Sequence, residues 1–117
     1  MRDHKTLLAW QEAREVSRAA LHLSRNHWSP AGAGLLAQLQ RAALSVQVNI
    51  AEGYGLKTSA QFRRHLNIAY GSALETADLL ELGLESKLVP EAESKALDHC
   101  RRCQALILGL IKSPRRS

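Results

Sequence analysis

Apolar residues recur at intervals of three and four positions in four segments of this chain, and short breaks separate the segments. The segments cover about residues 3–26, 33–54, 59–87 and 90–113. Because this spacing places side chains on one face of a helix, the pattern predicts four amphipathic helices. The sequence shows no alternating pattern typical of a strand, no internal repeat and no low-complexity tract.

Each predicted helix carries one apolar face that we expect to enter a shared core. The four faces are Leu7, Trp10, Val16, Ala20 and Leu23; Leu35, Leu39, Ala43, Val46 and Ile50; Phe62, Leu66, Ala69, Ala73, Ala77, Leu80 and Leu84; and Ala96, Cys100, Cys103, Ile107 and Leu110. The second helix also has Leu36, Leu44 and Val48 outside its main face. A helix that is apolar on more than one face usually has more than one neighbour, and here a second subunit is one candidate.

Residues at the predicted helix ends match known capping patterns. Asp3 is a suitable N-cap for the first helix. Thr58 and Gln61 have the spacing of a capping box at the start of the third helix. Gly53 or Gly55 is expected to end the second helix in the left-handed conformation that glycine adopts readily.

These elements predict an all-α fold in one domain that covers residues 1–117. Four helices with short connections predict an antiparallel up-down-up-down four-helix bundle. Leucine, alanine, valine and isoleucine must build the core, because aromatic residues make up only 4% of the chain. Alanine and leucine are both strong helix formers, which favours the all-α fold. We expect Pro90 in the first turn of the fourth helix and a loose basic tail, 114–117, that includes Arg115 and Arg116.

The chain is basic, with a formal net charge of +5, and the excess is unevenly distributed. Between residues 31 and 70 the basic residues outnumber a single acidic one, Glu52; they are Arg41, Lys57, Arg63 and Arg64. Such a group, beside the N-terminus of the third helix, predicts contacts with phosphates. The alternative is a solvated face that balances acidic residues on a neighbour. The few aromatic side chains argue against base stacking, so nucleic acid would be bound through its backbone or shape.

Polar residues interrupt the apolar pattern of the second and third helices. Asn49 and Glu52 lie near the end of one helix, and Ser72 and Glu75 lie within the next. Because buried polar groups need partners, we expect these two pairs to bond across the helices and fix their register. Gly71 is expected to be a point of close packing, since a glycine inside a helix is costly.

The remaining chemistry-bearing residues do not form a recognisable catalytic or metal-binding motif. Cys100 and Cys103 lie within a helix on its apolar face, which favours buried thiols over a redox pair or a zinc site. Gly53-Tyr54-Gly55 is too short for a phosphate loop. The histidines show no ligand spacing such as His-Glu-x-x-His, and no Arg-x(4–6)-His pattern of helical ribonucleases; they are His4, His22, His27, His65 and His99. We therefore predict no enzyme activity, no catalytic residue, no metal and no cofactor.

Nothing in the sequence indicates a membrane protein. No apolar run is long enough to span a bilayer, and the charged start of the chain is not a signal peptide. The two cysteines are too few and too close together for a secreted disulfide framework. We expect a cytoplasmic protein that does not contact membranes.

Five short motifs in their order along the chain resemble a known family. They are Leu-Leu-Ala-Trp-Gln at 7–11, Gln-Arg-Ala-Ala-Leu-Ser at 40–45, Asn-Ile-Ala-Glu-Gly at 49–53, Phe-Arg-Arg-His-Leu-Asn-Ile-Ala-Tyr-Gly-Ser at 62–72, and Ile-Lys-Ser at 111–113. Together they resemble the four-helix-bundle proteins encoded in 23S rRNA intervening sequences, over nearly the whole chain.

The resemblance implies a bundle that assembles as a homopentameric barrel. That family is related to the accessory variability determinant of diversity-generating retroelements, a basic pentamer that binds nucleic acid and a reverse transcriptase. The family positions that match have a structural role; in this chain they are Asn49, Glu52, Gly53, Gly71, Ser72 and Glu75. The chain departs from the family at Val46-Gln47, where Ile-Pro is frequent, and at 56–58, where the family has a more basic loop.

Two functions are compatible with these observations. The first is a non-enzymatic, basic, oligomeric bundle that binds structured RNA, DNA or a nucleoprotein such as a reverse transcriptase complex through phosphate contacts. The second is a scaffold oligomer that recognises a protein partner and does not bind nucleic acid. Reversal of charge at Arg63 and Arg64 should abolish the first function and leave the second intact.

Overall fold

The computed structural model describes residues 3–113, all in helices or short connections. No strand occurs in this range. The segments are the 3-10 helix η1 (His4–Thr6), α1 (Leu8–Asn26), α2 (Ala33–Tyr54), α3 (Ser59–Glu85), the 3-10 helix η2 (Glu91–Glu93) and α4 (Lys95–Lys112). The basic tail expected at 114–117 lies outside the described residues.

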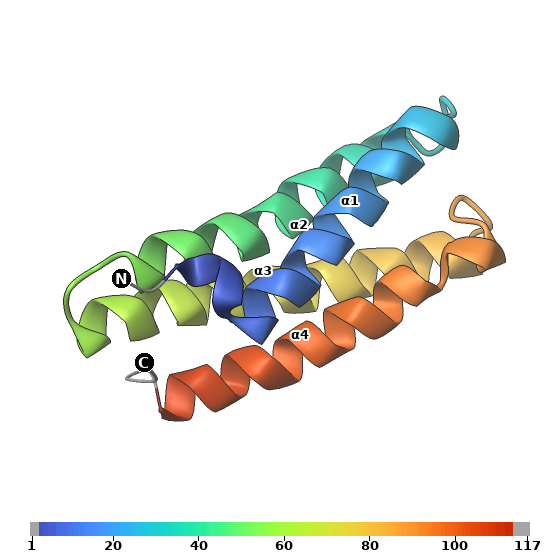
Figure 1. Cartoon of the computed structure of the whole chain (residues 1–117). Coiled ribbons are helices and arrows are strands. Elements are labelled where there is room, and N and C mark those ends of the chain that lie inside the picture. Colours follow the sequence, from blue (N-terminus) through green and yellow to red (C-terminus); the bar gives the residue numbers. More distant parts are fainter. Residues whose placement is uncertain (1–2, 114–117) are drawn as a thin grey trace.

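The four long helices lie side by side in an elongated molecule with extents of 44 × 20 × 19 Å. Helix α2 packs against α1 and α3, and α4 packs against the same two helices from the other side. Figure 1 shows the α2–α3 turn at the same end as the two chain termini. The α1–α2 and α3–α4 connections lie at the opposite end.

The core runs between the four helices and consists mainly of small and branched aliphatic side chains. The predicted apolar faces are largely confirmed: Val16, Leu39, Leu66 and Ile107, one from each long helix, are all buried. One placement was wrong, because Leu36 was assigned outside the main face of the second helix and is fully buried. The face of α2 that enters the core is therefore rotated slightly from the predicted one.

The capping predictions were partly right. The capping box is present. The backbone N–H of Gln61 donates to Thr58 Oγ1 at 3.1 Å, and the backbone N–H of Thr58 donates to Gln61 Oε1 at 3.3 Å. Asp3, however, accepts from the amide of Lys5 and caps η1, while α1 begins only at Leu8. The chain leaves helical geometry between these two elements, so the predicted continuous helix is divided.

Gly55 is the C-cap of α2, as one of the two predicted alternatives has it, but the predicted left-handed conformation was wrong. Gly55 follows the helix with a φ of −76°, which any residue adopts, and Gly53 lies within the helix. Among the described residues only Lys87, after α3, has a positive φ, of 60°. The predicted start of the fourth helix was also early, since Pro90 precedes η2 and α4 begins at Lys95.

Candidate nucleic-acid interface

Polar side chains connect α2 to α3 along much of their length. The hydroxyls of Ser45 and Ser72 are 2.8 Å apart, in hydrogen-bond contact. Farther toward the α2–α3 turn, Asn49 Oδ1 lies 3.0 Å from Nδ1 of His65. These contacts occur between half-buried side chains, where a lost partner is costly, so they restrict how the two helices can slide.

The cross-helix bonding was predicted, but its pairing was not. Asn49 and Glu52 both lie against His65, with Glu52 Oε1 3.9 Å from its Nδ1, and not against Ser72 or Glu75. The predicted cross-helix group did not include His65. Its position seven residues before Ser72 places both on one helical face, and this spacing could have identified it.

The glycine of the Asn-Ile-Ala-Glu-Gly motif permits this close contact. A Cβ atom on Gly53 would lie 2.6 Å from Cβ of His65 and 3.0 Å from Cδ1 of Phe62. Gly71, in contrast, is exposed and has no atom of another element within 4 Å of such a Cβ. The prediction that Gly71 is a close-packing point within the bundle was therefore wrong, and Gly53 has that role.

The structure separates Arg41 from the other three basic candidates. Arg41 donates to Glu75 Oε2 at 2.5 Å and to Gln38 Oε1 at 2.7 Å. It lies thirteen residues before Tyr54, or about 20 Å along α2 from the turn that holds Lys57. Its charge is largely balanced by Glu75, so Arg41 belongs to the helix–helix contact.

Three basic candidates lie together near the α2–α3 turn. Lys57 is in the turn, and Arg63 and Arg64 are in the first turns of α3. Arg63 Nε donates to the carbonyl oxygen of Ile111 at 3.2 Å, so this side chain stabilises the C-terminus of α4. Lys57 and Arg64 are exposed, and no acidic side chain of residues 3–113 forms an ion pair with either.

Two further features increase the positive potential at this end. Lys112 lies in the last turn of α4, next to the residue that Arg63 contacts. The first turn of α3 holds no acidic residue to offset the positive end of the helix dipole. We refer to Lys57, Arg63, Arg64 and Lys112 together as the basic end.

An ion-pair cluster joins α1 to α4. Glu12 Oε1 lies 2.6 Å from His99 Nδ1, and Glu12 Oε2 lies 3.3 Å from Arg102 Nε. Partial burial alone would raise the pKa of Glu12, but hydrogen bonds from His99 and Arg102 and their charges lower it below its ordinary value. The cluster therefore contributes to the packing of α1 against α4.

Both thiols are buried, as predicted, and neither forms a disulfide. The Cys100 thiol donates to the carbonyl oxygen of Ala73 at 3.3 Å, and the Cys103 thiol to that of Ala9 at 3.4 Å. Burial raises the pKa of Cys100 to about 11 and raises that of Cys103 as well. Both residues therefore act as small core side chains rather than as nucleophiles.

None of the described helices combines the length and apolar character that crossing a bilayer would require.

Comparison with protein families identifies the chain over most of its length. The family model for 23S rRNA-intervening sequence proteins matches residues 5–109. The chain belongs to this family. The resemblance drawn from the five motifs is thus confirmed, and two motifs of this family member, 49–53 and 62–72, supply the α2–α3 contacts around Gly53 and His65.

A solved structure supports the fold of this family member. It is a protein of unknown function from the S23 ribosomal protein family of Bacteroides thetaiotaomicron VPI-5482, with a TM-score of 0.78 and 21% sequence identity. The match covers 90% of this chain and 99% of that one. At this identity the likeness establishes the fold and not the function. A search of curated proteins gave no significant match.

Proposed function

We propose that this member of the family is a non-enzymatic protein that binds structured RNA, or a nucleoprotein, through phosphate contacts at the basic end. One observation supports this most directly: Lys57 and Arg64 are exposed beside the N-terminus of α3, and no acidic side chain of residues 3–113 pairs with them. Unpaired cations next to a helix N-terminus are well suited to phosphate oxygens.

The basic end is suited to the nucleic-acid backbone rather than to bases. The aromatic residues that flank the α2–α3 turn, Tyr54 and Phe62, pack edge-to-face on each other with ring centroids 5.7 Å apart. Phe62 is buried and Tyr54 is half-buried, which makes them poor platforms for base stacking. Affinity should therefore depend on the number of phosphates contacted and on the fold of the RNA, and little on its sequence.

We further propose that the chain forms the antiparallel up-down-up-down subunit of a homopentamer. Hydrogen-bonded pairs support the antiparallel order, because Ser45 and Asn49 on α2 pair with Ser72 and His65 on α3, in reverse sequence order. Large apolar side chains that remain exposed on α2 and α3 support the assembly: Val48, Ile68, Leu74 and Leu82. Five copies at +5 each would carry +25, so five basic ends would act together.

The test is binding of a fluorescent RNA hairpin, followed by anisotropy, to a Lys57→Glu/Arg64→Glu variant. The matched control is Arg25→Glu/Lys95→Glu, which changes the net charge equally at exposed positions at the other end of the molecule. We expect the first variant to lose at least about tenfold in affinity and the control to lose less. Arg63 is left intact, since its bond to Ile111 would make loss of folding an alternative explanation.

Binding that is absent even at low salt would contradict the proposal, and so would equal losses in both variants. In that case the scaffold function, with recognition of a protein such as a reverse transcriptase, becomes the better candidate. The exposed apolar side chains Trp28 and Leu8, at 59% and 62% exposure, favour such a partner. Capture of a partner that is unaffected by the Lys57→Glu/Arg64→Glu changes would support it.

A further inference from the structure

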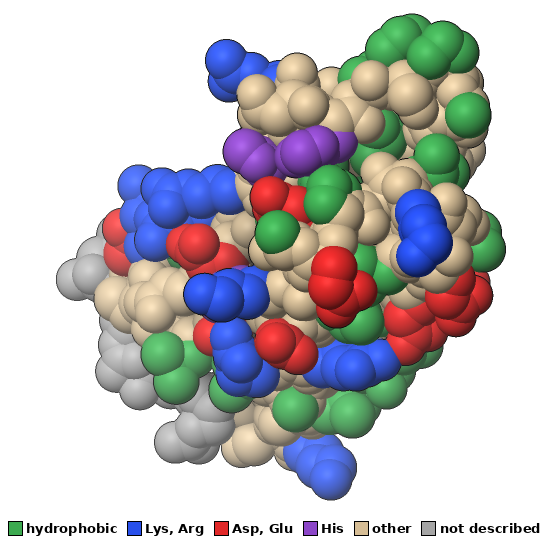
Figure 2. Space-filling view, turned by 90° about the vertical axis from the view of Figure 1, so that its right-hand side faces the viewer, with side chains coloured by type: hydrophobic (Ala, Val, Ile, Leu, Met, Phe, Trp, Pro, Cys, Tyr) green, Lys and Arg blue, Asp and Glu red, His purple; other side chains and the backbone are tan. Residues whose placement is uncertain are grey.

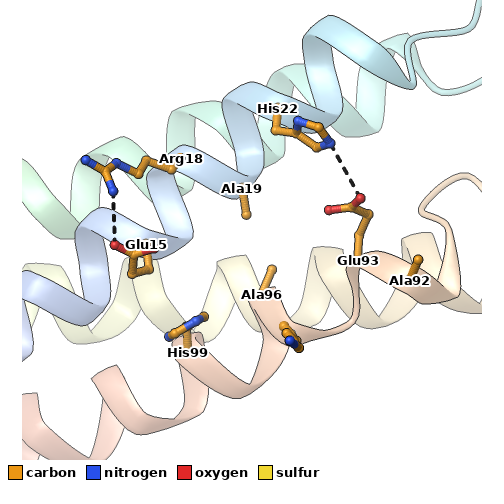
Figure 3. Close-up of a pocket in the computed structure, with 9 residues that line it drawn as sticks. Glu15, Arg18, Ala19, His22, Ala92, Glu93, Ala96 and His99 are labelled. Carbon is orange, nitrogen blue, oxygen red and sulfur yellow. Dashed lines mark hydrogen bonds and ion pairs between the residues drawn. The ribbon is translucent and has the colours of Figure 1, made fainter.

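Two histidines and a glutamate converge at the end of the molecule opposite the basic end. Nε2 of His22 lies 3.4 Å from Oε2 of Glu93, and Nε2 of His27 lies 4.0 Å from the same oxygen. One potential ligand atom from each of the three residues lies within 4.8 Å of the other two. Figure 3 shows His22 on α1 and Glu93 before α4 pointing toward each other. Both residues line a cavity of about 360 Å³.

The end of α1 explains why sequence spacing does not reveal this cluster. Positions five apart on a continuous helix point about 140° away from each other at roughly 100° per residue. Helix α1 ends at Asn26, and His27 leaves it with φ −130° and ψ 25°. This change of direction brings the His27 ring to 5.7 Å from the His22 ring, centroid to centroid. The third residue, Glu93, belongs to η2, which is distant from α1 in the sequence.

We propose that His22, His27 and Glu93 bind a divalent transition-metal ion of the Zn²⁺ type. Two imidazoles and one carboxylate are a ligand set that Zn²⁺ accepts, with a fourth position left for water or another ligand. With metal–ligand bonds of about 2.0–2.1 Å, tetrahedral ligand atoms lie about 3.3–3.4 Å apart, close to the His22–Glu93 distance. The separation of His27 Nε2 and Glu93 Oε2, 4.0 Å, is longer than this spacing, so the His27 side chain would have to move closer on binding of the ion.

A neighbouring amide already holds one of the proposed ligands in position. The side chain of Asn26 contacts Nδ1 of His22 at 3.0 Å, so Nε2 of that ring faces Glu93. The Asn26 Nδ2 that makes this contact also donates to the backbone carbonyl oxygen of His22 at 3.1 Å, so the amide contacts both the ring and the backbone of His22. A metal on Nε2 would place a proton on Nδ1, and the Asn26 amide would then have to move away from that nitrogen.

The charges around the cluster permit a cation. Arg18 also lines the cavity, but it pairs with Glu15 at 3.3 Å. Lys95 lines the cavity as well and is exposed, so its charge is screened by solvent. Figure 2 looks at this end of the molecule and shows histidine side chains gathered at the surface, where an ion in solution can reach them.

The proposed site would connect two segments that are far apart in the sequence. His22 and His27 lie at the end of α1, whereas Glu93 belongs to the connection between α3 and α4. A bound ion would fix α1 to that connection and raise the thermal stability of the folded chain, because the unfolded chain does not present the three ligands together. The inference does not depend on the proposed binding of nucleic acid.

The test is calorimetric titration of Zn²⁺ into the tag-free, chelator-treated chain, together with its melting temperature with and without Zn²⁺. We expect one Zn²⁺ per chain and a higher melting temperature, with no comparable effect of Mg²⁺, which prefers oxygen ligands. His22→Gln and Glu93→Gln should each lower the affinity for Zn²⁺ by more than about tenfold. Loss of a residue that only hydrogen-bonds to a metal ligand often lowers affinity by that much, and these residues are proposed to bind the ion directly.

The controls change the same residue types outside the cluster. His4→Gln and Glu91→Gln remove a histidine and a carboxylate that do not belong to it, and both variants should bind Zn²⁺ like the original chain. Absence of saturable binding would overturn the proposal, as would affinity that is unchanged in His22→Gln and Glu93→Gln. Fewer than one ion per chain would overturn it as well, because the site is complete within a single chain.

Discussion

Two glycines in the long helices, Gly53 and Gly71, should respond in opposite directions to the same added methyl group. At Gly53, a Cβ would lie 2.6 Å from His65 Cβ. At Gly71 no atom of another element lies within 4 Å. Alanine is favoured over glycine inside a helix by about 1 kcal/mol wherever it causes no clash.

The magnitude at Gly53 depends on how far the neighbour can move. His65 Cβ is attached directly to the α3 backbone, so rotation of the side chain does not remove the clash. Restoring an ordinary contact requires α2 and α3 to separate locally by about 1 Å, since carbon atoms pack at about 3.5–4.0 Å. Overpacking of this kind costs about 1–3 kcal/mol. Set against the gain of about 1 kcal/mol from alanine, this leaves a net loss of up to about 2 kcal/mol for Gly53→Ala, whereas Gly71→Ala should gain about 0.5–1 kcal/mol.

The assay is urea unfolding followed by circular dichroism, for the original chain and the two variants at equal protein concentration. The transition midpoint should fall for Gly53→Ala and rise for Gly71→Ala while the slope stays constant. A series of concentrations separates effects on the helix from effects on assembly. Gly53→Ala stabilised as much as Gly71→Ala, or Gly71→Ala destabilised at every concentration, would refute the assignment of close packing to Gly53.

Three further predictions concern single groups. Thr58→Ala should destabilise the fold by about 1 kcal/mol in urea unfolding, because it removes the α3 cap. At about pH 8, Cys100 and Cys103 should resist iodoacetamide in the folded chain and react after denaturation, as mass spectrometry would show, because burial keeps the thiols protonated. Contacts with its neighbours lower the pKa of Glu12. Its contribution to the free energy of unfolding should therefore be fully present above the ordinary pKa of glutamate and be lost as the pH falls through the lowered pKa. In Glu12→Gln, the free energy of unfolding should depend less on pH in this acid range.

Local features of the fold were predictable because they depend on neighbours in sequence. The periodicity of the second segment gave the bounds of α2, and Thr58 with Gln61 gave the start of α3. Gly53 and Gly71 could not be distinguished in this way, because both are glycines near polar residues in helical segments. What separates them is the position of His65 on the next helix, which is a tertiary contact.

The candidate site shows the same division between local and tertiary information. The sequence grouped Arg41 with the other basic residues by composition, but Arg41 pairs with Glu75, which lies on another helix. The spacing of histidines along the sequence did not reveal the cluster of His22, His27 and Glu93. These residues come together because α1 ends between the two histidines and because the distant α3–α4 connection supplies Glu93. Charge counts along the chain carry no information on which cations remain free to meet a phosphate.

The salt dependence of RNA binding tests the proposed function most directly. Anisotropy of a fluorescent hairpin would be measured over a range of salt concentrations for the original chain and for Lys57→Gln/Arg64→Gln. Each lost phosphate contact should lower the steepness of log affinity against log salt by about 1, so the variant should be shallower by about 2 per RNA-contacting subunit. Equal slopes, or no binding by the original chain at low salt, would contradict the assignment of the basic end as the nucleic-acid interface.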